Sequence, residues 1–221
     1  MPEVEVLEIA PVGYNVFQFR TTKPEDYRFR PGQATDLSLL IPGWEEEKRP
    51  FSFTSLPNQK TLEFTIKIYP DHDGVTEQLS KIIVGQKFEI GEPWGAIEYR
   101  GPGIFIAGGS GLTPFLGILR TLSMDPEVDD VNTLFFANKT SRDIFCDTDL
   151  AGMPRVRTFH VLSEEEVEPH HHGRIDKDFL AEKVPFFDQP FYVCGPDQMV
   201  KDVTAVLEEL GANPKGIVFE K

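Results

Sequence analysis

The fold is decided by one stretch of the sequence, IFIAGGSGLTPF at residues 104–115. The apolar run at 104–107 predicts a buried strand, and the glycines after it predict a tight turn into a helix. Thr113 is expected to cap that helix, and Pro114 suits its first turn. The backbone N–H groups of such a helix start can bind a diphosphate, and glycines let a ligand approach the backbone closely. The plainer interpretation is a turn that binds nothing.

The same alternation of apolar runs and helical patterns continues to the end of the sequence. It predicts a C-terminal α/β domain at residues 101–221, with a parallel sheet and helices on both of its faces. The expected strands are 104–107, 133–137, 156–162, 191–194 and 217–219, and the expected helices are 114–124, 143–150, 177–183 and 196–210.

A second glycine turn, CGPDQM at residues 194–199, follows another predicted strand. Ligands bind outside the carboxyl ends of parallel strands, so both glycine turns are expected to border one crevice. Cys194 would then point into that crevice. The plainer interpretation of a lone buried cysteine is a small core hydrophobe.

Residues 1–100 show a different sequence pattern, with short runs of β-branched and aromatic residues between Pro-Gly, Pro-Asn and Gly turns. This pattern predicts an antiparallel β-barrel. One helix is expected at 74–83, where Val75, Leu79, Ile82 and Ile83 share a face. The expected strands are 4–9, 15–20, 34–40, 51–54, 62–69, 87–90 and 96–99.

The barrel half contains the run RPFSFTS at residues 49–55. An arginine, an aromatic ring and a hydroxyl, at Arg49, Phe51 and Ser52, can bind phosphate, stack on a planar ring and hydrogen-bond the ring edge. By itself the run is also an ordinary amphipathic strand.

The composition excludes several classes of protein. With 40% hydrophobic and 26% charged residues the sequence is that of a globular protein, and a formal net charge of −14 argues against nucleic acid or an anionic membrane as partner. Two cysteines are too few for a zinc site or an iron–sulfur cluster, so we expect neither. The histidine run 170–172 is interpreted as a solvated loop, so no metal is expected. The absence of a signal-peptide pattern and of an apolar membrane span favours a cytoplasmic protein.

Four motifs together resemble the ferredoxin–NADP reductase superfamily of flavoenzymes: RPFS at 49–52, GVT at 74–76, GGSGLTPF at 108–115 and CGP at 194–196. They are similar to flavodoxin and ferredoxin reductases and to the reductase modules of oxygenases. The resemblance implies a flavin-binding barrel at residues 1–100 and an NAD(P)H-binding domain at 101–221. It also implies hydride transfer between the two cofactors, and a small redox protein or oxygenase component as acceptor. FAD is favoured over FMN, because the loop at 69–74 could hold an adenine.

The resemblance also implies roles for individual residues. Arg49 would bind a flavin phosphate, Phe51 would stack on the isoalloxazine and Ser52 would hydrogen-bond flavin N5. Ser52, Cys194 and Glu220 would align the hydride transfer. The implied cofactor-binding residues are Arg49, Pro50, Phe51, Ser52, Thr65, Ile66, Lys67, Gly74, Val75, Thr76, Gly108, Gly109, Ser110, Gly111, Thr113, Pro114, Ser163, Cys194, Gly195, Pro196 and Met199.

The preference between NADH and NADPH is predicted from the residues after the strand at 156–162. Relatives that prefer NADP tend to place Ser then Arg there, whereas Ser163 is followed by three glutamates, which would repel a 2′-phosphate. NADH is therefore favoured, with Arg142 and Arg174 as cations that could still bind NADPH. Only Lys221 follows Glu220, where many relatives have an aromatic residue, so an open flavin face is expected.

Two other functions stay open on the sequence. One is a reductase of free flavin or ferric complexes, and the other is a non-autonomous electron-transfer subunit of a larger complex.

Overall fold

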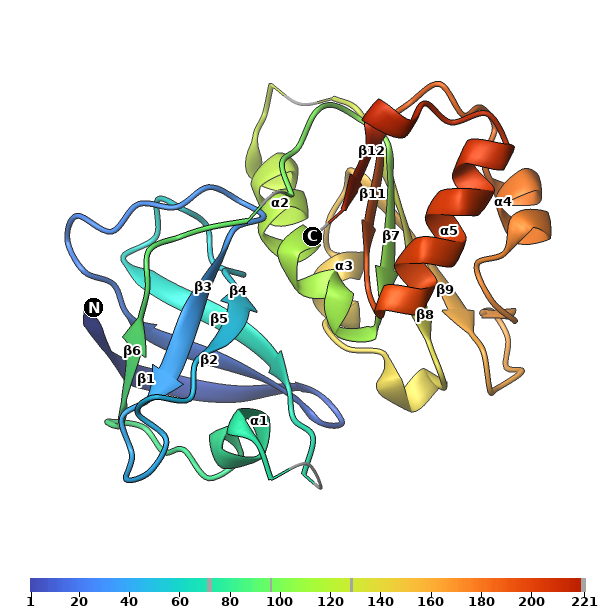
Figure 1. Ribbon diagram of the computed structural model, residues 1–221. Coiled ribbons are helices and arrows are strands. Elements are labelled where there is room, and N and C mark those ends of the chain that lie inside the picture. The colour runs from blue at the N-terminus through green and yellow to red at the C-terminus, as the bar shows by residue number, and fades with distance from the viewer. Residues whose placement is uncertain (71–72, 96, 128, 220–221) are drawn as a thin grey trace.

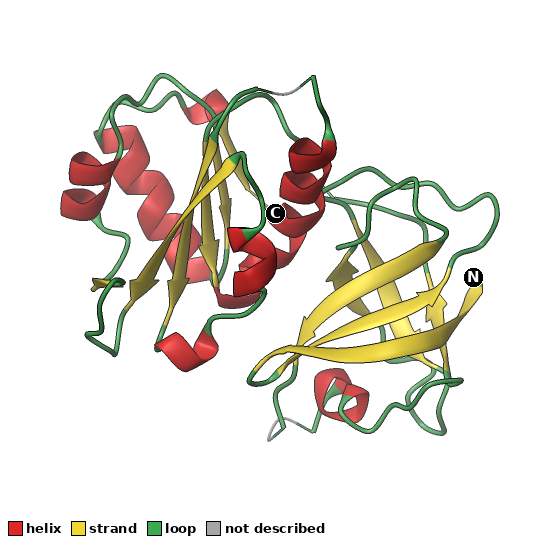
Figure 2. Ribbon diagram, turned by 180° about the vertical axis from the view of Figure 1, so that it is seen from behind, coloured by secondary structure: helices red, strands yellow, loops and turns green. Residues whose placement is uncertain are grey.

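The computed structural model of the protein describes residues 1–70, 73–95, 97–127 and 129–219. Two halves lie side by side, and each is built around a six-stranded sheet (Figure 1). The first half holds antiparallel strands and one short helix, and the second half holds a parallel sheet flanked by helices (Figure 2). This architecture confirms the predicted fold class. Within the described ranges, no helix is long and apolar enough to cross a membrane.

The strands of the first half follow the order β4-β3-β6-β1-β2-β5. An isolated bridge between Phe53 and Phe64 connects the two ends of this order, which closes the sheet into a barrel. Both rings are fully buried in the barrel core, and α1 adds Val75 and Leu79 to that core. The elements are β1 (Glu3–Gly13), β2 (Val16–Thr22), β3 (Ala34–Leu39), β4 (Arg49–Ser52), β5 (Thr61–Lys67), α1 (Val75–Leu79) and β6 (Lys87–Ile90).

Two details of the barrel half correct the prediction. None of the described residues of the predicted strand 96–99 is in a strand, because Ile97 leaves the barrel and packs into the core of the second half. The helix predicted at 74–83 ends at Leu79. Ile83 was expected on its buried face, but it lies beyond the helix end and is 66% exposed.

The second half has six parallel strands in the order β10-β9-β8-β7-β11-β12. Helices α2 and α3 pack on one face of this sheet, and α4 and α5 pack on the other (Figure 1). The two-residue strand β10 was not predicted from the sequence. The elements are β7 (Ile104–Gly108), α2 (Thr113–Met124), β8 (Asn132–Asn138), α3 (Asp147–Ala151), β9 (Val156–Leu162), β10 (His171–His172), α4 (Lys177–Lys183), β11 (Phe191–Cys194), α5 (Asp197–Glu209) and β12 (Ile217–Phe219).

The start of α2 differs from the predicted cap. A 3₁₀ turn at Gly109–Leu112 leads directly into the helix, so Thr113 is its first residue and Leu112 occupies the cap position. The hydroxyl of Thr113 donates to the Ser110 carbonyl at 3.0 Å. Pro114 lies in the first turn, as predicted, where its missing N–H costs no helical hydrogen bond.

The two halves share a buried contact around the β1–β2 hairpin. Val16 belongs to the same buried cluster as Phe145 of the second half. A Cβ on Gly13 would lie 2.6 Å from the Cβ of Phe145. The hairpin therefore packs so closely on the second half that position 13 has no space for a side chain. The backbone N–H of Cys146 donates to the carbonyl of Val12 at 2.9 Å. The hairpin is therefore anchored in the second half.

Candidate functional site

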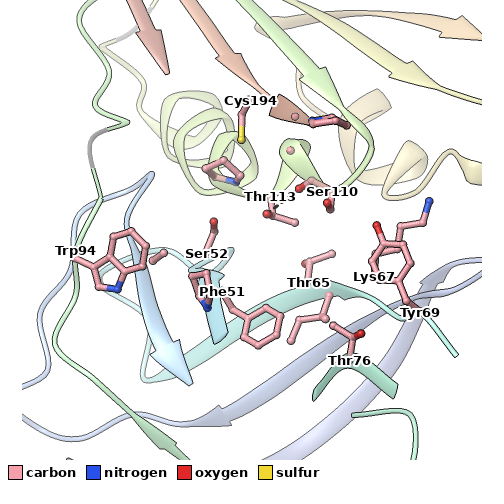
Figure 3. Close-up of a pocket in the computed structure, with 17 residues that line it drawn as sticks. Phe51, Ser52, Thr65, Lys67, Tyr69, Thr76, Trp94, Ser110, Thr113 and Cys194 are labelled. Atoms are coloured by element: carbon pink, nitrogen blue, oxygen red, sulfur yellow. Dashed lines mark hydrogen bonds between the residues drawn. The ribbon is translucent and has the colours of Figure 1, made fainter. Parts of the chain in front are cut away.

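A cavity of about 490 Å³ opens between the two halves (Figure 3). Strands β4 and β5 and the start of α1 form its barrel side, and the starts of α2 and α5 form its other side. The structure therefore brings residues of all four motifs to one cavity, and both glycine turns border it. The predicted residues that line the cavity are Pro50, Phe51, Ser52, Thr65, Ile66, Lys67, Thr76, Ser110, Gly111, Thr113, Pro114, Cys194, Gly195 and Pro196.

On the barrel side, the cavity meets a ring, a hydroxyl and a cation. Phe51 and Ser52 are both half-buried at the end of β4, with Lys67 at the end of the neighbouring β5 (Figure 3). The Thr65 hydroxyl lies 3.0 Å from the hydroxyl of Thr54, which fixes the rotamer of this buried side chain. This wall can therefore stack on a planar ring and hydrogen-bond its edge.

On the other side, the two glycine turns touch each other. A Cβ on Gly111 would lie 2.2 Å from the carbonyl oxygen of Cys194, and a Cβ on Gly195 would lie 3.1 Å from the backbone of Gly108. The sequence argument assigned the glycines to close approach of a ligand. The structure adds a different reason, since the close approach at these positions is between one turn and the other.

Cys194 satisfies both of its sequence interpretations. Cys194 is 7% exposed and belongs to the buried cluster under α2. It also lines the cavity, and its sulfur points toward the barrel wall (Figure 3). Cys146, the other cysteine, lies outside the lining, and burial raises the pKa of its thiol to about 12. A thiol with that pKa stays protonated at neutral pH and is inert.

Several predicted residues do not line the cavity. Arg49 is exposed, and its guanidinium donates to Glu47 at 3.2 Å and to the carbonyl of Lys48 at 2.7 Å. Val75 is buried in the barrel core. The others outside the lining are Gly74, Gly108, Gly109, Ser163 and Met199, and Glu220 lies outside the described residues.

An ion pair crosses the interface beside the cavity. The Lys67 ammonium lies 3.3 Å from a carboxylate oxygen of Asp143, and both side chains are largely buried. Burial alone would raise the pKa of Asp143. Hydrogen bonds from Thr140 and the charge of Lys67 outweigh burial and hold that pKa below its ordinary value. Asp143 is therefore a carboxylate at neutral pH.

A second polar cluster centres on Arg120 of α2. Its guanidinium donates to the Thr54 carbonyl at 2.5 Å, to Glu63 of β5 at 2.6 Å and to Asp149 of α3 at 2.6 Å. One side chain thus connects the barrel with two helices of the second half. Burial lowers the pKa of Arg120, but the two carboxylates more than compensate and raise it above its ordinary value.

The residues after β9 are engaged with the neighbouring loop. Glu164 pairs with Lys139 at 3.0 Å, and Glu165 accepts a hydrogen bond from the Ser141 N–H at 2.5 Å. That hydrogen bond is the main cause that lowers the pKa of Glu165. Ser163 is therefore followed by two carboxylates that are engaged with the neighbouring loop.

Arg142 was a candidate cation for a 2′-phosphate. Its guanidinium carbon lies 3.3 Å from the ring centroid of Tyr14, in the β1–β2 hairpin. The side chain is therefore directed toward the barrel hairpin by a cation–π contact.

Sequence reasoning missed three lining residues: Ala34, Tyr69 and Trp94. Tyr69 lies two residues after the end of β5, at the junction of the predicted strand 62–69 and the predicted adenine loop 69–74, and this position was an available signal. Trp94 carried no signal, because its position depends on an isolated bridge between distant segments.

A barrel whose strands face two glycine turns of a parallel sheet defines a two-domain protein of the dinucleotide-binding class. The chain belongs to the ferredoxin–NADP reductase superfamily. Residues 4–99 match the family described as oxidoreductase FAD-binding domain, and residues 105–205 match the oxidoreductase NAD-binding domain. This membership confirms the resemblance drawn from the four motifs.

Three similar proteins illustrate this membership. The reductase component of propane 2-monooxygenase from Rhodococcus jostii (strain RHA1) is 28% identical over 98% of this chain and 62% of its own length. One of the subunits of 1,2-phenylacetyl-CoA epoxidase from Escherichia coli (strain K12) is 31% identical over 89% of this chain and 60% of its own length. A ferredoxin NADP+ reductase structure from Neisseria gonorrhoeae, with bound FAD and NADP, shares the fold with a TM-score of 0.85 and 22% identity, over 99% of this chain and 97% of that one. The chain therefore spans about three fifths of the two curated relatives.

Proposed function

We propose that the protein is a flavin-dependent NAD(P)H reductase. Residues 1–100 bind FAD, residues 101–221 bind the nicotinamide cofactor, and electrons leave to a small redox protein or an oxygenase component. The observation that carries this proposal is the shared cavity, in which the ends of β4 and β5 face both glycine turns.

The barrel side of the cavity fits an isoalloxazine ring. Phe51 supplies a stacking surface and Ser52 a hydroxyl that can hydrogen-bond flavin N5, while Thr65, Ile66 and Lys67 place strand backbone along the ring. Thr76 brings the start of α1 to the same cavity, which suits the flavin diphosphate. Arg49 reaches a phosphate only after it leaves Glu47, and the exposed pair is weak enough to exchange.

The other side fits a nicotinamide dinucleotide. Ser110, Gly111 and Thr113 present a helix start and two hydroxyls to the cavity, where a diphosphate can accept hydrogen bonds. Cys194 lies on the adjoining turn and is the side chain nearest to where the nicotinamide would stack. The acidic residues Glu164 and Glu165 after Ser163 favour NADH over NADPH.

The chemistry of the proposed reaction belongs to the cofactors, because bound flavin takes up hydride and releases electrons singly or in pairs. The residues of the chain position the reactants. Ser52 would hold one ring edge by a hydrogen bond, and Cys194 would fill the space beside the nicotinamide. Glu220 is proposed as a further aligning group, on the family pattern alone.

The acceptor proposal rests on the named relatives. Two of the similar proteins are a monooxygenase reductase component and an epoxidase subunit, which supports an oxygenase component as partner. The formal net charge of −14 favours an acceptor with a basic contact surface.

The first test is the cofactor content of the purified chain and its reduction by NADH. We expect heat-released FAD, a yellow protein, and NADH-dependent reduction of ferricyanide by the isolated chain. Arg49→Ala should weaken FAD binding about ten- to hundredfold, because it removes a charge-assisted phosphate contact. Arg20→Ala is the matched control, since Arg20 is an exposed β2 residue paired with Glu8.

Released FMN would show the FAD assignment to be wrong. An Arg49→Ala protein with wild-type FAD affinity would remove Arg49 from the site. A chain that binds free flavin only weakly and turns it over as a substrate would instead be a flavin reductase.

A further inference from the structure

Trp94 lines the cavity, but the proposed function gives it no role. Its position is set by the backbone: the N–H of Trp94 donates to the Ala34 carbonyl, and the Ala34 N–H donates to the Trp94 carbonyl, both at 2.8 Å. On its other side, Ala34 pairs directly with Ser52 of β4. Ser52, Ala34 and Trp94 therefore form one row across three adjacent strand segments.

Directly paired residues in a sheet place their side chains on the same face. The row therefore turns Ser52, Ala34 and Trp94 toward the cavity, and all three line it. Ala34 is buried and small, so it leaves open space between the Ser52 hydroxyl and the indole. The Trp94 residue is 38% exposed, and Figure 3 shows it at the end of the cavity opposite Lys67 and Tyr69.

The order of these groups fixes which edge of a flavin meets the indole, on the premise of the proposed function. Backbone of β5 and the Ser52 hydroxyl meet the polar atoms of the isoalloxazine, which lie along its pyrimidine ring and N5. Neighbouring strands are about 4.8 Å apart, so Trp94 lies about 10 Å beyond Ser52 on the side away from β5. The apolar dimethylbenzene edge then points at Ala34 and Trp94, an apolar methyl and an aromatic ring.

We propose that the indole of Trp94 packs against the dimethylbenzene edge of the bound flavin and covers it. The contact is a flavin-binding interaction that the sequence motifs do not include. It also makes Trp94 the side chain that separates this ring edge from solvent.

The test compares Trp94→Ala and Trp94→Phe with Trp44→Phe. Trp44 is a matched control, because it packs on the barrel core and does not line the cavity. Loss of an aromatic contact should raise the dissociation constant for FAD about two- to tenfold in Trp94→Ala. The fluorescence of bound flavin should rise severalfold, since an indole in contact quenches it. Trp94→Phe should restore most of the affinity, and Trp44→Phe should change neither quantity.

The outcomes separate this inference from the proposed function. A wild-type chain that binds no flavin refutes the proposed function. A wild-type chain that binds FAD, with Trp94→Ala unchanged in affinity and flavin fluorescence, overturns the inference alone. The same holds if Trp94→Ala loses only its rate with a protein acceptor and keeps both flavin properties, because the indole would then belong to partner docking. Thermal unfolding of the flavin-free variants checks that the Ala34 bridge and the fold persist.

Discussion

Cys194 contacts both the buried cluster and the cavity, so its replacement should affect both stability and hydride transfer. Its backbone carbonyl is in the contact with the turn at Gly111, while its side chain lies between the buried cluster and the cavity. Sequence reasoning treated the core role and the site role as alternatives. Cys194 is the last residue of the buried strand β11, so its small side chain can contact both the core and the cavity.

Cys194→Ala should slow flavin reduction by NADH about tenfold, which corresponds to about 1.4 kcal/mol of lost alignment. The removed sulfur also leaves a small void, so the free energy of unfolding should fall by about 1 kcal/mol. Stopped-flow reduction and thermal melts measure the two effects. Cys146→Ala is the control, since it removes a buried thiol outside the cavity. Equal reduction rates in wild type and Cys194→Ala would leave a packing role alone.

The residues after β9 predict the nicotinamide preference. The acidic residues Glu164 and Glu165 follow Ser163, so a 2′-phosphate there would meet like charge. We expect a higher kcat/KM for NADH than for NADPH, and we expect the double change Glu164→Gln and Glu165→Gln to raise kcat/KM for NADPH about tenfold. Glu182→Gln, an exposed change on α4, should change kcat/KM for neither NADH nor NADPH. A wild-type preference for NADPH would contradict this assignment.

At the scale of elements, the sequence predicted the parallel sheet well because most of its strands are apolar runs, and two of them, β7 and β11, lead into glycine turns. It predicted the wrong start for α2, because a 3₁₀ turn before Thr113 leaves no signal in residue type. It predicted a strand at 96–99 because Ile97 and Tyr99 alternate like barrel residues. Those side chains instead serve the contact between the two halves, which local pattern does not encode.

The glycine turns provide a matched pair of substitutions. Gly111→Ala would place a Cβ 2.2 Å from the Cys194 carbonyl, so we expect a loss of about 3 kcal/mol or more in the free energy of unfolding. Gly109 has a φ of +51° and open space around it, so Gly109→Ala should cost about 1–2 kcal/mol for the left-handed backbone alone. Denaturant unfolding measures both. Equal losses of unfolding free energy in the two variants would mean that the two turns can move apart to accept the added Cβ at position 111.

At the scale of the whole molecule, several polar contacts and a buried cluster join the halves. Arg120 bridges β5 and α3, Lys67 meets Asp143, and Val16 enters the core of the second half. These contacts hold the cavity walls at a fixed separation. None of them could be predicted from the sequence, because each joins segments that are distant along the chain.

The Lys67–Asp143 pair predicts an acid-dependent loss of stability. The pKa of Asp143 is lowered in the folded protein, so its contribution is present above the unfolded pKa of about 3.9 and is lost as pH falls through the folded value. Asp143→Asn should lower the free energy of unfolding by about 1–2 kcal/mol at pH 7, and the difference from wild type should shrink below pH of about 4. Urea unfolding across this range measures it. Asp26→Asn, an exposed change away from the interface, is the control, and a difference that stays constant with pH would contradict the assignment.

The hairpin that touches Phe145 also bears on how the protein forms during translation. The barrel is synthesised first, so Val16 and Gly13 leave the ribosome long before the segment that covers them. At about 5–20 residues per second, the hairpin tip waits several seconds with an apolar side chain in water. A nascent chain stalled before residue 145 should therefore expose Val16, an apolar residue that the complete protein buries.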